Sequence, residues 1–545
     1  MSQINLPIKI DFSFSKNQAL IENSIIIAFL LFGLVGILNH EIWRDEFQAW
    51  LLARDSASLI ELFHNMQYEG HPGLWHLCLY GLSQITHNPL IMQIFHLSVS
   101  VVIVTLIVKF SPFSLLHKFL LSFGYYFFYE YTIISRNYNL GILFIFLFCV
   151  IYSKNKVKPI LLAIVLALMA NTNVFAFILS FAFALTLIDS FYSQIKTNQF
   201  NKQKFLTSLL ILFSGWGLSF LQIIRPLISQ EQLIRPIQSS TEQIQSSSSL
   251  FQELETLGKI VTDIWRSYIP IPYQLNNNFW NTNILIHSNI FPTVGGISLG
   301  VFIAALGSLI LLLISIKILA QKRLVLTLYL FGTGSIMAFS YLIFHGVMRH
   351  RGHLFILLIA CLWILKKELL KQHNLTSKQI AESRFRNQFL TVILSFHLLA
   401  GIHAYSVDLF YPFSVGRETA QYIQENNLDK LTIVGQRDRQ ASVLSGYLGQ
   451  QIYYPETGEF GSFWTVQTTL KDIKMTEGLI RDNPNKTLLV LTYQLKSDSV
   501  FPPDIKITEL NRFVKPTIEP FEKSFYIYTA QVEPTPENSS NPDKK

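Results

Sequence analysis

Charged residues are scarce in this chain. Lys, Arg, Asp and Glu make up only 14% of its 545 residues, whereas hydrophobic residues make up 50%. Soluble globular chains carry nearer a quarter charged residues. The deficit is concentrated in apolar runs, each close to the roughly 20 residues that a bilayer crossing needs. The composition excludes an ordinary soluble protein and predicts a multi-pass membrane protein.

Cysteine is scarce as well. Cys78, Cys149 and Cys361 are scattered along the apolar part of the chain, and the polar C-terminal part has none. A disulfide framework is therefore excluded there. The chain also lacks a Gly-rich nucleotide-binding loop, a Cys/His zinc pattern and a nucleophile elbow. We predict no metal site and no certain cofactor, and the sequence leaves dependence on a divalent metal open.

The apolar runs of residues 21–405 predict an α-helical polytopic module, because backbone polar groups in lipid must be satisfied within their own segment. About eleven spans are expected, at about Ile21–Leu38, Leu90–Val108, Phe113–Tyr131, Tyr138–Tyr152, Val157–Ala170, Val174–Ile188, Phe205–Ile224, Gly295–Leu319, Leu324–Phe344, Leu354–Leu365 and Phe389–Tyr405. The run 157–188 has an alternative as a single long helix. We favour two helices that turn at Asn171–Asn173, because one crossing would put a lysine cluster on the wrong side.

Basic residues are distributed unevenly between the connections. Alternate connections hold the clusters Lys9 and Lys16; Lys109 and Lys118; Lys154, Lys156 and Lys158; Lys196, Lys202 and Lys204; Lys317, Lys322 and Arg323; and Lys366, Lys367, Lys371, Lys378, Arg384 and Arg386. The positive-inside rule then places residues 1–20 in the cytoplasm and, after an odd number of spans, the C-terminal part on the opposite, outer side of the membrane. Topology explains the net charge of +8, so we predict no nucleic-acid partner.

The first outer stretch, 40–88, has the pattern of surface helices. Phe47, Trp50 and Leu51 form one apolar face at helical spacing. Ser58 and Glu61 have the spacing of a capping box. A third segment, Gly73–Gln84, is too short and polar to cross the bilayer. We expect helices that lie in the membrane surface, the third of which is a surface or half-inserted helix.

Two other regions are polar. The outer stretch 225–289 is rich in Ser, Gln, Asn and Pro, with helical periodicity at Leu250–Trp265, and its composition indicates an exposed loop. Residues 413–532 alternate helix and strand patterns, which predicts a small α/β domain. Its elements are expected at Ser414–Asn427 (helix), Leu431–Val434 (strand), Gln440–Leu448 (helix), Gln451–Tyr454 (strand), Leu470–Arg481 (helix) and Thr487–Thr492 (strand). The tail 533–545 is predicted to be disordered.

Two charged motifs occur in the first outer stretch. Arg44, Asp45 and Glu46 directly follow the first span, and Glu69 and His71 sit in the Gly/Pro turn Tyr-Glu-Gly-His-Pro. Charged residues commonly mark a helix end at the membrane surface. The turn, however, returns a second acid and a histidine toward the same carboxylates, which favours a functional site.

At these residues the chain resembles a known family. A first span, an outer Asp-Glu pair, surface helices and a His-Pro turn with aromatic followers are similar to family 39-type glycosyltransferases of the GT-C fold. That group includes protein O-mannosyltransferases, the aminoarabinose transferases of lipid A and related bacterial enzymes. The resemblance covers roughly Ile21–Tyr405 and is most specific at His40–His76.

The resemblance implies roles for these residues. The Asp of the pair is the catalytic base in the family, which corresponds to Asp45, with Glu46 beside it. An acceptor hydroxyl must lose its proton as it attacks the anomeric carbon, and a positioned carboxylate accepts it. Arg44 would keep Asp45 ionised. His71 would orient the pair or contact the leaving phosphate.

A second cluster comprises Glu130, Arg136 and Tyr138, between two spans on the outer side. Many relatives carry a further acid after this arginine, whereas this chain has Asn137 there. The second acidic role would then fall to Glu69 or Glu130. Arg136 has two interpretations, interfacial snorkelling and phosphate binding.

A third cluster lies in His345–His353, again on the outer side, and contains Arg349, His350 and Arg351. Arginines outside oppose the positive-inside preference, which indicates a function, although contact with lipid headgroups is the alternative. Arginine matches phosphate geometry, and fixed cations stabilise the charge that develops on a leaving phosphate. The histidine spacing fits no standard metal-ligand pattern.

The sequence and the resemblance together predict a hexosyl- or pentosyltransferase. It would move a sugar, with inversion, from a polyprenyl-phosphate donor to a glycan, lipid or protein acceptor on the outer face. Such a transferase has no nucleotide-sugar supply outside the cytoplasm, which favours a lipid-linked donor. The alternatives are a polysaccharide polymerase, a lipid or glycan transporter, and a non-catalytic relative. A transporter would place ionisable residues in mid-span.

Overall fold

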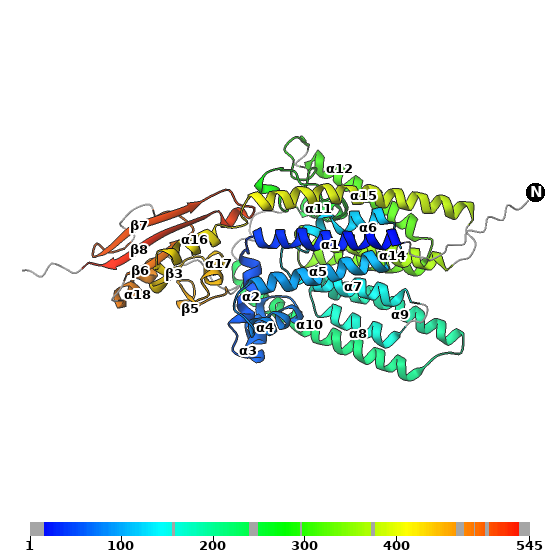
Figure 1. The fold of residues 1–545 in the computed structure, drawn as a ribbon, viewed down its shortest axis with the longest axis horizontal. Helices are drawn as coiled ribbons and strands as arrows, with labels where there is room; N and C mark the ends of the chain where they lie inside the picture. Colours follow the sequence, from blue (N-terminus) through cyan, green and yellow to red (C-terminus); the bar gives the residue numbers. More distant parts are fainter. Residues whose placement is uncertain are drawn as a thin grey trace, which may run out of the picture.

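The computed structural model describes residues 16–154, 158–238, 249–294, 297–371, 376–464, 473–483, 486–495 and 501–533. A bundle of helices is followed by an α/β domain that sits at one end of it (Figure 1). We call this end of the bundle the domain end, and the opposite end the far end. The predicted fold class, a helical membrane module with a small C-terminal α/β domain, is confirmed. The predictions for residues 1–15 and for the tail from residue 534 lie outside the described residues.

The bundle is built from long apolar helices. These are α1 (Lys16–Asn39), α5 (Leu90–Phe110), α7 (Tyr138–Tyr152), α8 (Pro159–Ala170), α9 (Val174–Lys196), α10 (Lys202–Gln238), α12 (Leu299–Leu319), α13 (Arg323–Leu342), α14 (Met348–Leu370) and α15 (Ser377–Phe410). Within the described residues, seven helices are long and apolar enough to cross a membrane, and α7 and α8 are shorter apolar helices. The run 157–188 forms two helices, α8 and α9, that turn at 171–173 as predicted.

The basic clusters lie at the far end of the bundle. Lys109 at the end of α5 and Lys118 both pair with Glu22 near the start of α1, at 3.4 and 2.8 Å. The start of α1 and the end of α5 therefore meet at the end remote from the α/β domain (Figure 1). The bundle thus separates its lysines from its C-terminal domain along the direction of the helices.

The predicted span Phe113–Tyr131 differs from the structure, where it is not one continuous helix. It consists of α6 (Leu115–Ser122) and a π-helical turn, η2 (Tyr125–Glu130). At the break, α15 approaches so closely that a Cβ on Gly401 would lie 2.7 Å from the carbonyl oxygen of Phe123. The π-helical turn and the turns after it lead the chain to the domain end and place Arg136 there.

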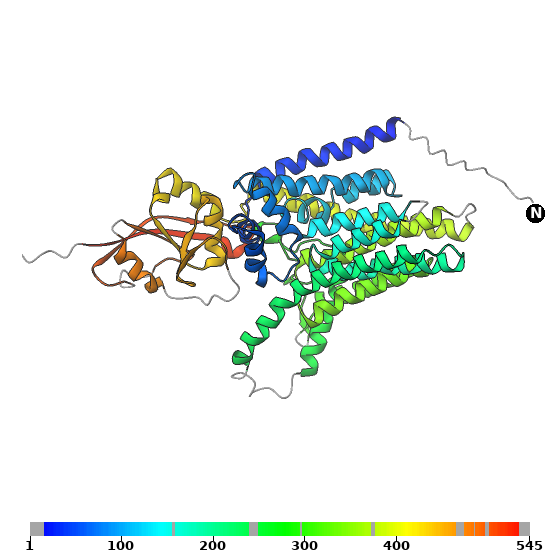
Figure 2. The ribbon, with the colours of Figure 1, turned by 90° about the horizontal axis from the view of Figure 1, so that it is seen from below.

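Three short helices cover the domain end, as predicted. They are α2 (Arg44–Arg54), α3 (Leu59–Asn65) and α4 (Leu74–Ser83), and they lie between the bundle and the α/β domain (Figure 1). The predicted apolar face of α2 is completely buried. Ser58 caps α3 by accepting a hydrogen bond from the Glu61 amide at 3.2 Å. The second outer stretch is more helical than its composition indicates, because α10 extends to Gln238 and α11 (Ser249–Tyr268) follows; both project to one side of the bundle (Figure 2).

The C-terminal domain contains a six-stranded sheet in the order β5-β4-β3-β6-β8-β7. Its elements are α16 (Gly416–Glu425), β3 (Thr432–Gly435), α17 (Asp438–Leu448), β4 (Ile452–Tyr454), β5 (Glu459–Gly461), α18 (Glu477–Asp482), β6 (Thr487–Leu491), β7 (Ile505–Val514) and β8 (Ser524–Val532). The predicted strands correspond to β3, β4 and β6, which pair in parallel. The antiparallel strands β5, β7 and β8 were not predicted. The outer strand β7 is largely exposed and charged, so its apolar pattern is weak.

Candidate active site

A cavity of about 280 Å³ opens at the domain end of the bundle. Its polar wall is formed by Glu69, His71, Arg136, Tyr138, Arg349 and His350. Its apolar wall is formed by Val174, Phe175, Ile223, Phe339, Ile343 and Phe344, from α9, α10, α13 and the residues just after α13. The three charged clusters of the sequence therefore meet at one place, although they are separated by up to 300 residues.

Asp45 lies beside the cavity, in the first turn of α2. Its Oδ2 is 3.2 Å from Nη1 of Arg136 and 3.2 Å from Nη2 of Arg349, and its Oδ1 is 3.5 Å from Nε of Arg44. The side chain remains 19% exposed. Burial acts to raise the pKa of Asp45, but the three guanidinium groups outweigh it and lower that pKa below its usual value. Asp45 is therefore an ionised carboxylate in the free protein.

Aromatic rings hold one of these arginines in place. The guanidinium of Arg349 lies 5.7 Å from the ring of Trp43 and 5.5 Å from the ring of Trp280, within cation–π range. Its backbone carbonyl accepts a hydrogen bond from the hydroxyl of Tyr131 at 2.5 Å. Arg349 is thus fixed at the polar wall before any ligand arrives.

Glu69 and His71 reach the cavity from the Gly/Pro turn, where Gly70 adopts a φ of +67° that favours glycine. The Nε2 of Gln48 donates a hydrogen bond to Oε1 of Glu69 at 2.9 Å. Burial raises the pKa of Glu69. Burial and the nearby charge of Arg136 lower the pKa of His71 to about 3, so His71 is a neutral imidazole at neutral pH.

Glu46, predicted beside Asp45 as a catalytic residue, faces away from the cavity into the protein. Its Oε2 is 2.9 Å from Nε2 of His40, and its Oε1 accepts a hydrogen bond from the Ser135 amide at 2.5 Å. The Nδ1 of His40 is 2.8 Å from Oδ2 of Asp408 on α15. Successive residues on a helix point about 100° apart, which separates Asp45 from Glu46. The structure gives Glu46 a place in a buried ionic network that ties α1, α2 and α15 together.

His40→Leu is expected to lower the free energy of unfolding by about 3–5 kcal/mol, because Glu46 and Asp408 would remain buried without their cation. Burial acts to lower the pKa of His40, but the two carboxylates outweigh it and raise that pKa to about 10. The contribution of this group to stability is therefore complete below pH 6.5 and is lost as the pH rises through about 10. Unfolding of wild type and variant at pH 6 and pH 10 measures it; an equal loss at both pH values would contradict the assignment.

Of the remaining predicted residues, two line the cavity and two do not. Tyr138 and His350 line the cavity and share a hydrogen bond of 2.8 Å. Glu130 lies behind the cavity and accepts hydrogen bonds from Tyr125 and Trp280 at 2.7 and 3.1 Å. Arg351 points away.

Arg351 pairs with Asp263 of α11 at 2.5 Å and donates to the carbonyl oxygens of His345 and Gly346. The reason is that the predicted loop 345–353 is partly helical: α14 begins at Met348, so Arg351 projects from a different side of the helix than Arg349. Arg351 is thus not brought together with Arg136 and Arg349.

Further residues at the site were not predicted from the sequence. Gln48 lies one turn after Arg44 on α2, which the helical spacing could have revealed. Glu522 belongs to the C-terminal domain and lies 3.7 Å from Nε of Arg44. No sequence signal connects positions 478 residues apart.

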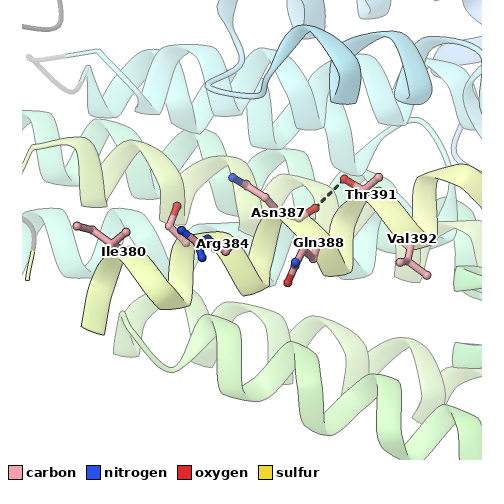
Figure 3. Close-up of a pocket in the computed structure, with 7 residues that line it drawn as sticks. Ile380, Arg384, Asn387, Gln388, Thr391 and Val392 are labelled. Atoms are coloured by element: carbon pink, nitrogen blue, oxygen red, sulfur yellow. Dashed lines mark hydrogen bonds between the residues drawn. The ribbon is translucent and has the colours of Figure 1, made fainter. Parts of the chain in front are cut away.

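A larger hollow lies elsewhere in the described structure. A groove of about 630 Å³ runs along α15 toward the far end (Figure 3). Arg384 is the only charged residue that lines it, and Thr391 is hydrogen-bonded to the Asn387 carbonyl within the same helix. It lacks the paired carboxylates and cations of the domain-end cavity. In the part of the chain that the structure describes, no group of three or more His, Cys, Asp or Glu could hold a metal ion.

The fold and the site define a multi-pass membrane protein with a charged and partly apolar cavity at one end of its helices. No family model matches the chain, and no curated protein matches it. Two solved structures are similar to it over most of their length. The chain is 11% identical to ArnT from Cupriavidus metallidurans bound to undecaprenyl phosphate, covering 93% of this chain and 97% of that one, with a TM-score of 0.41. For apo ArnT from the same organism the identity is 12%, the coverage 94% and 98%, and the TM-score 0.46.

Proposed function

We propose that the protein is a glycosyltransferase that moves a hexose or pentose from a polyprenyl-phosphate donor to an acceptor. The observation that carries the proposal is the composition of one cavity: its polar wall has two arginines and Glu69, and its other wall has aliphatic and aromatic side chains. Asp45 lies beside this wall and pairs with both arginines. A lipid-linked phosphate matches both walls, because it has an anionic head for the arginines and a hydrocarbon chain for the apolar side chains. A soluble anion would require no apolar wall.

The donor fits the cavity in one direction. Its phosphate would lie between Arg136 and Arg349, whose guanidinium groups both face Asp45 at 3.2 Å. Its hydrocarbon chain would follow Phe175, Phe339 and Phe344 toward the lipid. The neutral His71 and the Tyr138 hydroxyl then face the phosphate or the sugar as hydrogen-bonding groups.

Asp45 would act as the general base once the donor is bound. In the free protein it is held by the two arginines, which lowers its basicity. An arriving phosphate offers those arginines a second anion and weakens their hold on Asp45. The acceptor oxygen then attacks the anomeric carbon, its proton passes to Asp45, and the carbon–oxygen bond to the phosphate breaks. A single displacement of this kind inverts the anomeric centre, and the two arginines stabilise the charge on the departing phosphate.

Glu69 is the second candidate for the base, because it lines the cavity and burial raises its pKa. The two candidates predict different pH profiles, since a general base must be deprotonated and activity rises with pH through its pKa. If Asp45 is the base, the acidic limb of kcat/KM lies below the ordinary pKa of an aspartate, 3.8. If Glu69 is the base, the limb lies above 4.5. We expect the lower limb; a limb above pH 4.5 that disappears in Glu69→Gln would transfer the role to Glu69.

The distribution of basic residues supports an orientation. Lys109, Lys118 and the other described lysine clusters belong to the far end, and we propose that this end faces the cytoplasm of the plasma (inner) membrane. The cavity and the C-terminal domain then lie on the outer face. The test starts from Cys78→Ser, because Cys78 is partly exposed at the domain end whereas Cys149 and Cys361 are buried. In that background Lys506→Cys, in the exposed β7, should react with a membrane-impermeant thiol reagent in intact cells, and Lys204→Cys should not.

The decisive experiment supplies the purified protein with a panel of polyprenyl-phosphate sugars in lipid nanodiscs. Release of polyprenyl phosphate, by hydrolysis or by transfer, supports the proposal. The acceptor is a glycan, lipid or protein. If the donors bind but none of them is hydrolysed or transferred, a transferase of this class is refuted.

A further inference from the structure

We propose that the C-terminal domain is a positioning element of the catalytic site, which holds both site carboxylates through two residues of α2. Glu522 acts on Asp45 through Arg44, and the backbone of Trp464 acts on Glu69 through Gln48. The inference rests on the proposed function for its kinetic consequence, although the contacts themselves do not depend on it.

The first connection runs from Glu522 to Asp45. Oε1 of Glu522 lies 3.4 Å from the backbone nitrogen of Arg44 and 3.7 Å from its Nε. The same Nε lies 3.5 Å from Oδ1 of Asp45. Glu522 is only 2% exposed, and burial raises its pKa well above the usual value. Glu522 thus accepts a hydrogen bond from the Arg44 backbone amide and lies next to the guanidinium that faces Asp45.

The second connection runs from the C-terminal domain to Glu69. Nε2 of Gln48 donates to the carbonyl oxygen of Trp464 at 2.9 Å, and Oε1 of Gln48 accepts from the Trp464 amide at 3.1 Å. The same Nε2 donates to Glu69. Gln48 is 3% exposed. Its amide is thus fixed from both sides by the domain, and its remaining hydrogen bond sets the position of Glu69.

The packing between α2 and α17 makes these connections rigid. Gly446 of α17 lies against Phe47 so closely that a Cβ would approach the ring to 2.2 Å. Tyr447 stacks edge-on against the same ring at 4.8 Å and donates to the carbonyl oxygen of Ile42 at 3.2 Å. The guanidinium of Arg417 donates to the His40 carbonyl at 2.6 Å. The domain therefore contacts both the residues that precede α2, at His40 and Ile42, and the helix itself, at Phe47.

The chemical reason for such an arrangement is the position of α2. This helix has eleven residues and lies outside the long helices. The bundle holds the face of its first turn that carries Glu46, whereas contacts with the C-terminal domain hold Arg44 and limit its freedom to move. A displacement of about 1 Å at a reacting group can lower a rate on the order of 10²-fold. A domain that holds α2 from outside the bundle removes that freedom.

Four variants test the inference in nanodiscs: Gln48→Leu, Glu522→Ala, Glu522→Gln and, as a control, Asn277→Ala. Asn277 donates a hydrogen bond of 2.9 Å to the Thr517 carbonyl, so the control removes a contact between the same two parts of the protein without touching α2. For Gln48→Leu and Glu522→Ala we expect faster hydrogen exchange of the α2 amides. We also expect a fall in kcat of between tenfold and 10²-fold at unchanged donor KM, since the arginines that bind phosphate stay in place.

The conservative variant and the exchange data decide the outcome. Glu522→Gln keeps an acceptor oxygen for the Arg44 backbone amide and should retain both kcat and α2 protection, as should Asn277→Ala. Unchanged α2 protection in Gln48→Leu and Glu522→Ala would overturn the inference, as would increased exchange with unchanged kcat. An inactive wild-type protein would refute the proposed function instead, and the exchange of α2 would then decide the positioning role alone.

Discussion

Asp45→Asn is expected to lower kcat for sugar transfer by about 10²–10⁴-fold, the range that a positioned general base contributes. The KM for the donor should stay constant or fall. The reason for the fall is that Arg136 and Arg349, which now pair with Asp45 at 3.2 Å, would lose a competing anion and bind the phosphate more tightly. Initial rates against donor concentration, measured in nanodiscs, separate the two constants.

Glu46→Gln is the matched control for this experiment, because it changes the neighbouring carboxylate but not the cavity. Its effect should appear in stability, since Glu46 is buried against His40. Equal kcat for Asp45→Asn and wild type would remove Asp45 from the reaction. An increase of KM with unchanged kcat would make it a binding residue only.

Arg349→Ala should lower kcat/KM by about 10²–10³-fold, which is the typical loss when one hydrogen-bonding group that stabilises developing anionic charge is removed. In contrast to Asp45→Asn, it should raise KM as well, because the cation contacts the phosphate in both the ground state and the transition state. Arg349→Lys should recover only part of this loss, since an ammonium group lacks the planar fork of guanidinium.

Arg351→Ala provides the comparison two residues further along α14. Arg351 pairs with Asp263 and not with Asp45, so its loss should destabilise the protein by leaving a buried carboxylate unpaired. Its donor KM should remain that of wild type. If Arg351→Ala raised KM as much as Arg349→Ala does, the phosphate would not lie between Arg136 and Arg349.

The membrane helices could be predicted because the bilayer imposes length and apolarity on each of them separately. Charge favoured two helices in the run 157–188, since a single helix would have put one lysine cluster on the wrong side, and the polar Asn171–Asn173 gave the place of the turn. The break in the span 113–131 could not be predicted: it lies where Gly401 approaches Phe123, which is 278 residues earlier in the chain. Local patterns carry no information on such contacts.

The site shows the same division. Asp45 could be chosen from the resemblance to the glycosyltransferase family, Glu69 and His71 from the Gly/Pro turn, and Arg349 from positive charge on the outer side, while Arg136 had two interpretations. The sequence could not show that Asp45 lies beside the cavity while Glu46 faces away from it, because this depends on which face of α2 meets His40. The connection of Arg44 to Glu522 required the C-terminal domain to be placed on α2, which alternating helix and strand patterns do not specify.

The end of α13 has a consequence for how such an enzyme would meet its donor. Ile343 and Phe344 line the cavity and are at the same time about half exposed on the surface of the bundle. A lipid-linked donor would enter the cavity laterally from the surrounding leaflet, without passing through water. Turnover would then follow the mole fraction of donor among the surrounding lipids, and diluting the membrane with inert lipid should slow the reaction even when the total amounts of enzyme and donor are held constant.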